Sequence, residues 1–193
     1  MVVQELKVRD YVQCEDFAVR MQVVFEEEEN PIILMSDEAH FHLNGTVNKQ
    51  NCHYWSPDNP HNINQRPLHS NHVTVWCAVV PFGIIGPYFF EENGVTVTVN
   101  SARYIEMITN FLWPELRRRR INCANLWFQQ DGARAHTVNE SMTIVQNMFP
   151  RHLISRFRDM PWPPRSPDLS MCDFFSLGTF EIVCLHSQTP YVE

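Results

Sequence analysis

The sequence predicts an α/β fold in which a mixed, five-stranded sheet is flanked by helices. Three observations support this. Short apolar runs of strand length recur along the chain, segments with apolar residues at helical spacing lie between them, and a hairpin pattern is followed by alternating strand and helix. The 193 residues are 44% hydrophobic, which is enough for one domain with a substantial core.

The strands are predicted from continuous or alternating apolar residues. The first begins at Ile32–Met35, a run typical of a strand buried on both faces, and continues through Asp37. A turn at Pro81–Gly83 joins the next two strands into a hairpin. The five predicted strands cover residues 32–43, 72–80, 83–90, 125–130 and 153–157.

Helical spacing of apolar residues predicts a helix over residues 10–25, which ends before Pro31. A second helix begins at Ser101 as its cap, and Pro114 should kink or end it. A third covers about 138–148. Its start is expected at Thr137, because Glu140 three residues later completes a capping-box pattern.

Composition and charge limit the possible functions. The net charge of −7 gives no general basic face for nucleic acid, so the dense run Arg117, Arg118, Arg119 and Arg120 is either a phosphate contact or a solvated helix end. Six cysteines without a C-x-x-C pair and without a signal peptide favour a reduced, intracellular chain. No apolar run reaches the roughly 20 residues of a membrane span.

Residues 44–71 are rich in asparagine, proline and histidine and predict a long ordered loop. A zinc site is the alternative, but the spacings match no standard zinc pattern, so we expect the loop. The zinc ligands would be Cys52, His53, His61 and His69.

Asp131 ends a short apolar strand, and Gly132 is expected to allow a tight turn into the next helix. A hairpin-containing three-strand unit followed by strand, helix and strand is the plan of an RNase H-like sheet, which places the first and fourth strands side by side. Asp37 would then face Asp131. Adjacent carboxylates need a cation between them, and Mg²⁺ suits such oxygen ligands.

Several segments in chain order resemble the catalytic domain of mariner-type DDE/D transposases, enzymes of transposable elements. The resemblance covers nearly the whole chain. It rests on 36–41 (SDEAHF), 75–76 (VW), 103–105 (RYI), 130–136 (QDGARAH), 164–169 (PRSPDL) and 172–175 (CDFF).

The resemblance implies an RNase H-like fold and DNA strand cleavage and joining that depend on two Mg²⁺ or Mn²⁺ ions. Water is the first nucleophile and the freed 3′-OH the second, with insertion at TA dinucleotides. It also implies DNA as partner, a homodimer in the intact enzyme, and a nuclear location. The loop over 44–71 matches an insertion that clamps a partner subunit.

The resemblance also assigns site residues. Asp37, Asp131 and Asp173 become the catalytic and metal-binding acids, and Asp168 is the rival for the third position. His136 is expected to orient Asp131 or contact a phosphate, unless it is simply a satisfied histidine at a helix start.

The sequence also departs from the family pattern. Met171 replaces the usual proline, residues 175–178 read FSLG where the family has FLWG, and the usual DNA-binding domain and final helices are missing. We therefore expect residues 1–30 to be a helical lead-in and 31–193 a truncated catalytic domain. The alternative is a catalytically silent remnant that binds nucleic acid or protein partners.

Overall fold

The computed structural model describes residues 7–42, 72–156, 158–164, 169 and 172. The predicted loop over 44–71, with its alternative zinc ligands, lies outside the described residues. So do both candidates for the third acid, Asp168 and Asp173.

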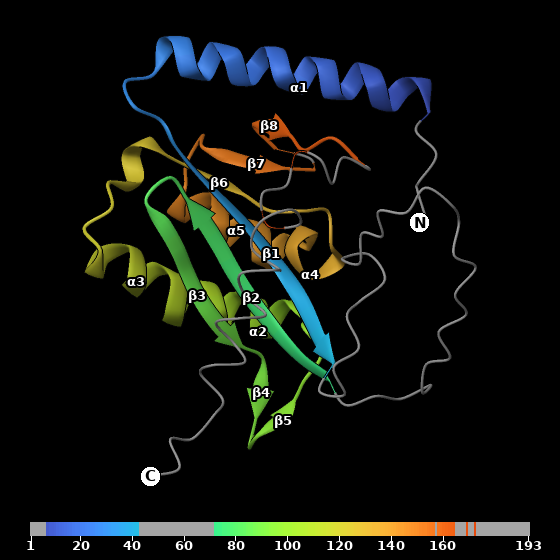
Figure 1. The fold of residues 1–193 in the computed structure, drawn as a ribbon, viewed down its shortest axis with the longest axis vertical. Helices are drawn as coiled ribbons and strands as arrows, with labels where there is room; N and C mark the ends of the chain where they lie inside the picture. Colours follow the sequence, from blue (N-terminus) through green and yellow to red (C-terminus); the bar gives the residue numbers. More distant parts are fainter. Residues whose placement is uncertain (1–6, 43–71, 157, 165–168, 170–171, 173–193) are drawn as a thin grey trace, which may run out of the picture.

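A six-stranded mixed sheet forms the centre of the molecule, in the order β3-β2-β1-β6-β7-β8 (Figure 1). The first three strands pair antiparallel, and β1, β6, β7 and β8 run parallel. The strands are β1 (Ile32–His42), β2 (His72–Val80), β3 (Gly83–Phe89), β6 (Leu126–Gln129), β7 (Leu153–Ser155) and β8 (Met160–Pro161).

The five predicted strands are all present, and β1 lies beside β6 as expected for the first and fourth predicted strands. The prediction missed β8, because two residues that include a proline carry no strand pattern. A small second sheet was also missed. It pairs β4 (Glu91–Glu92) with β5 (Val95–Thr96).

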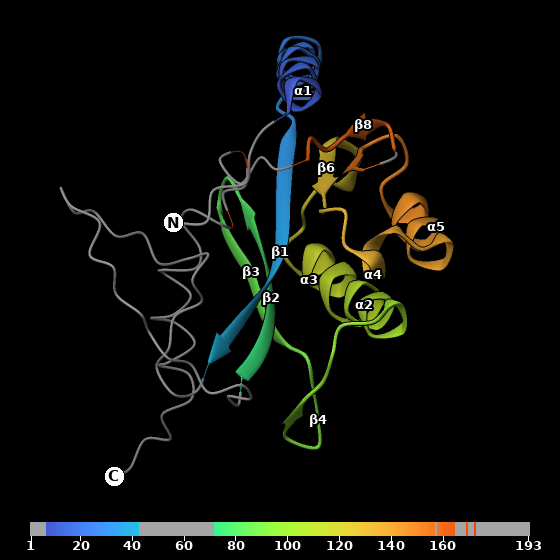
Figure 2. The ribbon, with the colours of Figure 1, turned by 90° about the vertical axis from the view of Figure 1, so that its right-hand side faces the viewer.

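The helices that follow the hairpin cover one face of the sheet, and α1 (Val8–Glu27) lies across one end (Figure 2). The covering elements are α2 (Ser101–Met107), the π-helix η1 (Ile108–Leu112), α3 (Trp113–Arg118), α4 (Arg134–Thr137) and α5 (Asn139–Met148). A short 3₁₀ turn, η2 (Cys123–Asn125), leads into β6.

Two details of the predicted helices were wrong. Asn100, not Ser101, caps α2, because its side chain accepts a hydrogen bond from the Arg103 amide. Near Pro114, where a kink or an end was predicted, the helix is interrupted: α2 ends at Met107, the π-helix η1 follows, and Pro114 lies in the first turn of α3.

The second error concerns Thr137, which does not cap α5. It ends the extra turn α4, and its hydroxyl donates to the carbonyl of Ala133 at 3.1 Å. Val138 occupies the cap position of α5 without a side-chain hydrogen bond.

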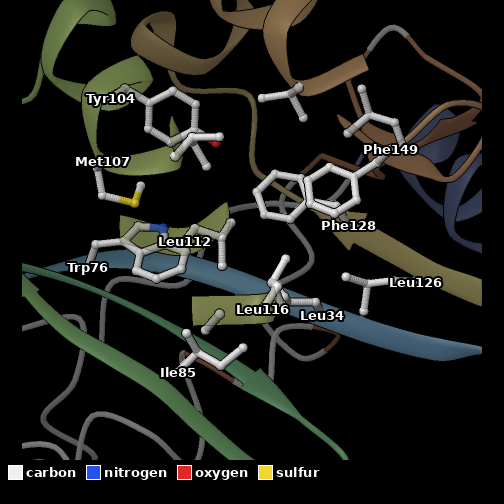
Figure 3. Packing of buried hydrophobic residues seen from close by; sticks show 14 of the residues in the cluster. Leu34, Trp76, Ile85, Tyr104, Met107, Leu112, Leu116, Leu126, Phe128 and Phe149 are labelled. Carbon is white, nitrogen blue, oxygen red and sulfur yellow. The ribbon is translucent and has the colours of Figure 1, made fainter. Parts of the chain in front are cut away.

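The main core fills the space between the sheet and the covering helices (Figure 3). Phe128 of β6 stacks on Phe149 with ring centroids 4.9 Å apart, and Leu34 of β1 packs into the same cluster. A second cluster attaches α1, where Phe17 packs edge-to-face on Trp162 at 5.3 Å. The two parallel strands β1 and β6 are thus both anchored by buried side chains.

Within the described residues, no helix is long and apolar enough to cross a membrane.

Candidate active site

The parallel pairing of β1 and β6 places two acids at the same level of the sheet. The last registered pair is Met35 with Gln129, where β6 ends. Asp37 and Asp131 each follow that pair by two residues. The end of a parallel strand is where open α/β sheets bind ligands, so this edge is the candidate site.

Asp131 is held by one of its two carboxylate oxygens. Oδ1 accepts hydrogen bonds from the Ala133 amide at 2.9 Å and from Nδ1 of His136 at 2.6 Å. Oδ2 has no partner among the described residues, and 48% of the side chain is exposed. The carboxylate is therefore oriented and still accessible.

Asp37 accepts a hydrogen bond from the amide of Glu38 at 2.8 Å, and its side chain is half-buried. Next to it on β1, Ser36 ties the two strands together. Its hydroxyl donates to the carbonyl of Gln129 at 2.8 Å, and its amide donates to the Gln129 side chain at 3.2 Å. These buried bonds fix the relative position of β1 and β6 directly below the two acids.

His136 links Asp131 to a second carboxylate. Its ring is 4% exposed, and Nε2 lies 3.2 Å from Oε1 of Glu38. Burial alone would lower the pKa of His136, but the hydrogen bonds and charges of Asp131 and Glu38 raise it to about 10. His136 is therefore an imidazolium at neutral pH that donates to both carboxylates.

His136 in turn changes the pKa of Asp131. Partial burial alone would raise its pKa, but the hydrogen bond from His136, the positive charge of that ring and the Ala133 amide outweigh burial, so the pKa is lowered. Asp131 is thus an anion at neutral pH, which is the form that binds a cation.

Tyr104 and Gln130 support this arrangement from the core. The ring centroids of Tyr104 and His136 are 4.2 Å apart, and the Tyr104 hydroxyl donates to Oε1 of Gln130 at 2.6 Å. Burial, followed by the charges of Glu38 and Asp131, raises the pKa of Tyr104, which therefore stays a neutral donor. The Gln130 amide contacts the His136 carbonyl, the Met142 sulfur and the Ser155 hydroxyl.

The arginine run lies away from the two acids. Arg117 and Arg118 end α3, and Arg119 and Arg120 follow it. All four precede β6, whereas Asp131 follows β6, so the strand separates them. Arg118 and Arg119 pair with Glu115 at 2.7 and 2.6 Å. The run thus lies at a helix end, where cations complement the helix dipole, and a phosphate contact stays a prediction.

Within the described residues, no cluster of three or more His, Cys, Asp or Glu side chains could hold a metal ion. The structure thus joins Asp131 to His136 and places Asp37 two residues beyond the same registered pair of β1 and β6 as Asp131, while Asp173 and Asp168 fall outside its description. Sequence reasoning missed Glu38 and Gln130 as parts of the site. Their positions beside Asp37 and Asp131 were visible, but their contacts depend on the fold.

Gly132 serves a different purpose from the predicted one. It is not among the described glycines with positive φ, so the turn does not demand glycine. A Cβ atom at this position would instead meet the Cδ atom of Arg156 at 3.1 Å. The glycine therefore lets the Arg156 side chain lie close against the backbone next to Asp131.

Several solved structures of Mos1 mariner transposase are similar to this chain. The catalytic domain of Mos1 mariner transposase matches with a TM-score of 0.60 and 16% identity, over 100% of this chain and 79% of that one. The chain has the fold of that catalytic domain. The predicted RNase H-like fold is thereby confirmed.

Larger Mos1 assemblies match as well. A paired-end complex with the left transposon end has a TM-score of 0.67 and 21% identity, and covers 95% of this chain and 51% of that chain. Paired-end complexes with Mn and with Mg share the same coverage at 20% identity, with TM-scores of 0.67 and 0.66. This chain thus spans about half the length of these proteins.

No protein-family model matches the sequence, and no curated protein matches it.

Proposed function

We propose that this chain is the metal-dependent catalytic domain of a mariner-type DNA transposase. The observation that supports this most is the placement of Asp37 and Asp131, each two residues beyond Met35 and Gln129, the last registered pair of the parallel strands β1 and β6. The matching Mos1 structures include complexes with transposon-end DNA and with Mn or Mg, which supports DNA as the partner and a divalent ion as the cofactor.

The residues present fit a divalent cation. Mg²⁺ prefers oxygen ligands and is held in many sites by one or two carboxylates together with water and substrate phosphates. Asp131 offers Oδ2, which has no partner within the described part of the chain, and Asp37 adds a second carboxylate. When bound, two such ions activate an attacking oxygen and stabilise the leaving oxygen in phosphoryl transfer.

The protein's own contribution to the reaction is orientation. His136 and the Ala133 amide hold Oδ1 of Asp131, so that Oδ2 points in a defined direction before any ligand arrives. Glu38 in turn fixes the other end of the His136 ring. A carboxylate held in this way loses less conformational freedom when it binds a cation.

Asp173 is proposed as the third acid. Cys172, which directly precedes it, is buried, and its thiol donates to the carbonyl of Met35 at 3.2 Å. Met35 lies two residues before Asp37 on β1. The contact supports Asp173 over Asp168, because Cys172, the residue directly before Asp173 in the chain, contacts β1.

We further propose two metal ions, a homodimer in the intact enzyme, action in the nucleus on TA-containing DNA, and strand transfer after cleavage. The alternative remains a catalytically silent, transposon-derived remnant.

The test is cleavage of TA-containing duplex DNA by the purified chain with Mn²⁺. Wild type should cut, Asp131→Asn should cut at a background rate, and Asp16→Asn should cut like wild type. Asp16 is a suitable control because it is an exposed carboxylate on α1 that pairs with Arg20. Cleavage that survives in Asp131→Asn would reject the site. If wild type neither cleaves DNA nor gains melting temperature with Mn²⁺, the silent remnant is favoured.

A further inference from the structure

Three neighbouring parallel strands each lead to a charged residue at the same level of the sheet. β7 lies on the other side of β6 from β1 (Figure 1). Asp37 and Asp131 each follow the last registered pair of β1 and β6 by two residues. On β7, Ile154 is registered with Gln129, so Arg156 also follows by two residues. An arginine thus extends the row of the two acids at the edge where such sheets bind ligands.

Hydrogen bonds directly before Asp131 and Arg156 fix their relative position. The Gln130 amide donates to the carbonyl of Ile154 at 3.0 Å, and the Gln130 side chain donates to the Ser155 hydroxyl at 3.2 Å. Gln130 and Ser155 are both fully buried. The acid and the arginine that follow them therefore start from a rigid base.

Gly132 allows the Arg156 side chain to lie against the loop that carries Asp131. A Cβ atom at Gly132 would lie 3.1 Å from Cδ of Arg156 and 3.8 Å from its Cβ and Cγ. The aliphatic part of the arginine thus lies over the glycine, and a larger residue there would displace it. Since Gly132 is not among the described glycines with positive φ, this contact is the reason for a glycine at the position.

The site needs positive charge on this side, because its acids repel an anionic substrate. Asp37, Asp131 and Glu38 bring three carboxyl groups to the site, and His136 is a cation that contacts two of them. Like charges repel strongly in the weakly polar surroundings of a protein surface. Arg156 is exposed, so its guanidinium is accessible to a substrate. Its planar fork of N–H donors matches two oxygens of a phosphate.

We infer that Arg156 binds the DNA phosphate at which the two acids act, with its guanidinium donating to the non-bridging oxygens. This contact holds the phosphate beside the acids and offsets the negative charge that develops on it during strand cleavage. The inference rests on the proposed function and deepens it, because it assigns a DNA-binding residue to the same site.

The test compares Arg156→Ala and Arg156→Lys with the control Arg151→Ala in the full chain. Arg151 is also exposed, but it precedes β7, whereas Arg156 follows that strand. Single-turnover cleavage of a TA-containing duplex is measured with Mn²⁺ and excess protein. Arg156→Ala should cleave at least about a hundredfold more slowly than wild type. Arg156→Lys should recover only part of this loss, because lysine keeps the charge without the fork, and Arg151→Ala should cleave like wild type.

Two further measurements separate a phosphate contact from a structural role. The Mn²⁺ affinity of Arg156→Ala, followed through the electron paramagnetic resonance signal of the free ion, should equal that of wild type. A residue that only organises the acids would change this affinity. DNA binding without divalent metal, measured over a series of NaCl concentrations, should lose about 0.9 from its salt slope in Arg156→Ala and keep the wild-type slope in Arg156→Lys.

Cleavage by Arg156→Ala at the wild-type rate, or an unchanged salt slope, would overturn the inference and leave the proposed function intact. Loss of cleavage together with weaker Mn²⁺ binding would also overturn it, since the arginine would then act through the acids. If wild type itself does not cleave DNA, the proposed function fails and the inference fails with it.

Discussion

At the scale of single residues, His136 replaces part of the positive charge that a metal ion would bring. The buried ring lies between Asp131 and Glu38 and donates to both. The hydrogen bond and positive charge of His136 lower the pKa of Asp131, so this carboxylate is already an anion before a cation binds. The site is therefore organised before a cation or DNA is present.

The substitution Tyr104→Phe tests how much the core behind the candidate site depends on the hydrogen bond between Tyr104 and Gln130. In Tyr104→Phe the buried Oε1 of Gln130 loses its donor at 2.6 Å, and an unsatisfied buried acceptor costs about 1–3 kcal/mol. We expect the free energy of unfolding, measured with urea, to fall by that amount. Tyr88→Phe is the control, because the Tyr88 hydroxyl makes no hydrogen bond with the described residues. Equal effects of the two substitutions would contradict this role.

The sequence predicted the residues that carry charge better than the contacts between them. Asp131 stands out as a carboxylate that ends an apolar strand and Asp37 as a carboxylate within one, while His136 was pointed out by the resemblance. Glu38 did not stand out, because successive side chains of a strand point to opposite faces, which puts Glu38 on the other face from Asp37. Only the fold shows that His136 contacts Glu38 there. For Gly132 the close approach of Arg156 depends on a residue 24 positions away in the sequence.

At the scale of elements, α1 is attached to the sheet by a small apolar cluster. Phe17 and Val24 are buried against Trp127 and Ile154, and Glu28 just beyond the helix accepts from the Trp127 indole at 2.9 Å. The acidic run that ends the helix is thus partly bound to the sheet. The helix contributes to the stability of the domain in addition to leading into it.

Phe17→Ala should therefore lower the free energy of unfolding by about 3 kcal/mol, because a buried aromatic ring is lost. Phe25→Ala on the same helix should cost less than about 0.5 kcal/mol, since Phe25 is 57% exposed against 7% for Phe17. Urea unfolding measures both values. A small effect of Phe17→Ala would mean that α1 is only a loosely attached segment.

Glu115 makes the stability of α3 depend on pH. Its hydrogen bonds to Arg118 and Arg119 lower its pKa to about 2. Since the pKa is lower in the folded state, the contribution is complete above the ordinary pKa of 4.5 and is lost as pH falls from there toward 2. We expect less than about 1 kcal/mol, because Arg118 is largely exposed to solvent.

The measurement is urea unfolding of wild type and Glu115→Gln between pH 6 and pH 3. The difference between them should shrink as the pH falls. A difference that stays constant over this range would show that the carboxylate charge does not stabilise the helix.

Strand and helix positions were predictable because hydrophobic periodicity extends over whole elements. Helix ends were less predictable, because several local solutions compete there. Thr137 follows a capping-box pattern, yet the chain forms the extra turn α4 and uses that hydroxyl inside it. Near Pro114 the interruption was predicted, but its form, a π-helical turn before the first turn of α3, was not.

At the scale of the whole molecule, the sheet brings together residues that are far apart in the sequence. The predicted strand order placed the first strand beside the fourth, and the pairing of β1 with β6 confirms it. The arginine run was the densest basic segment, but its position before β6 moves it to the far end of that strand. The arginine run and the acids Asp37 and Asp131 therefore lie apart because of their positions along the sheet, which the local charge density of the sequence does not show.

The most direct test of the account is Mn²⁺ binding to the full chain, followed through the electron paramagnetic resonance signal of the free ion. Wild type and Asp16→Asn should bind alike, while Asp37→Asn and Asp131→Asn should each lose at least about tenfold in affinity. This result would place the cation between β1 and β6. Equal Mn²⁺ affinity in all four proteins would contradict the shared metal site on which the proposed function depends.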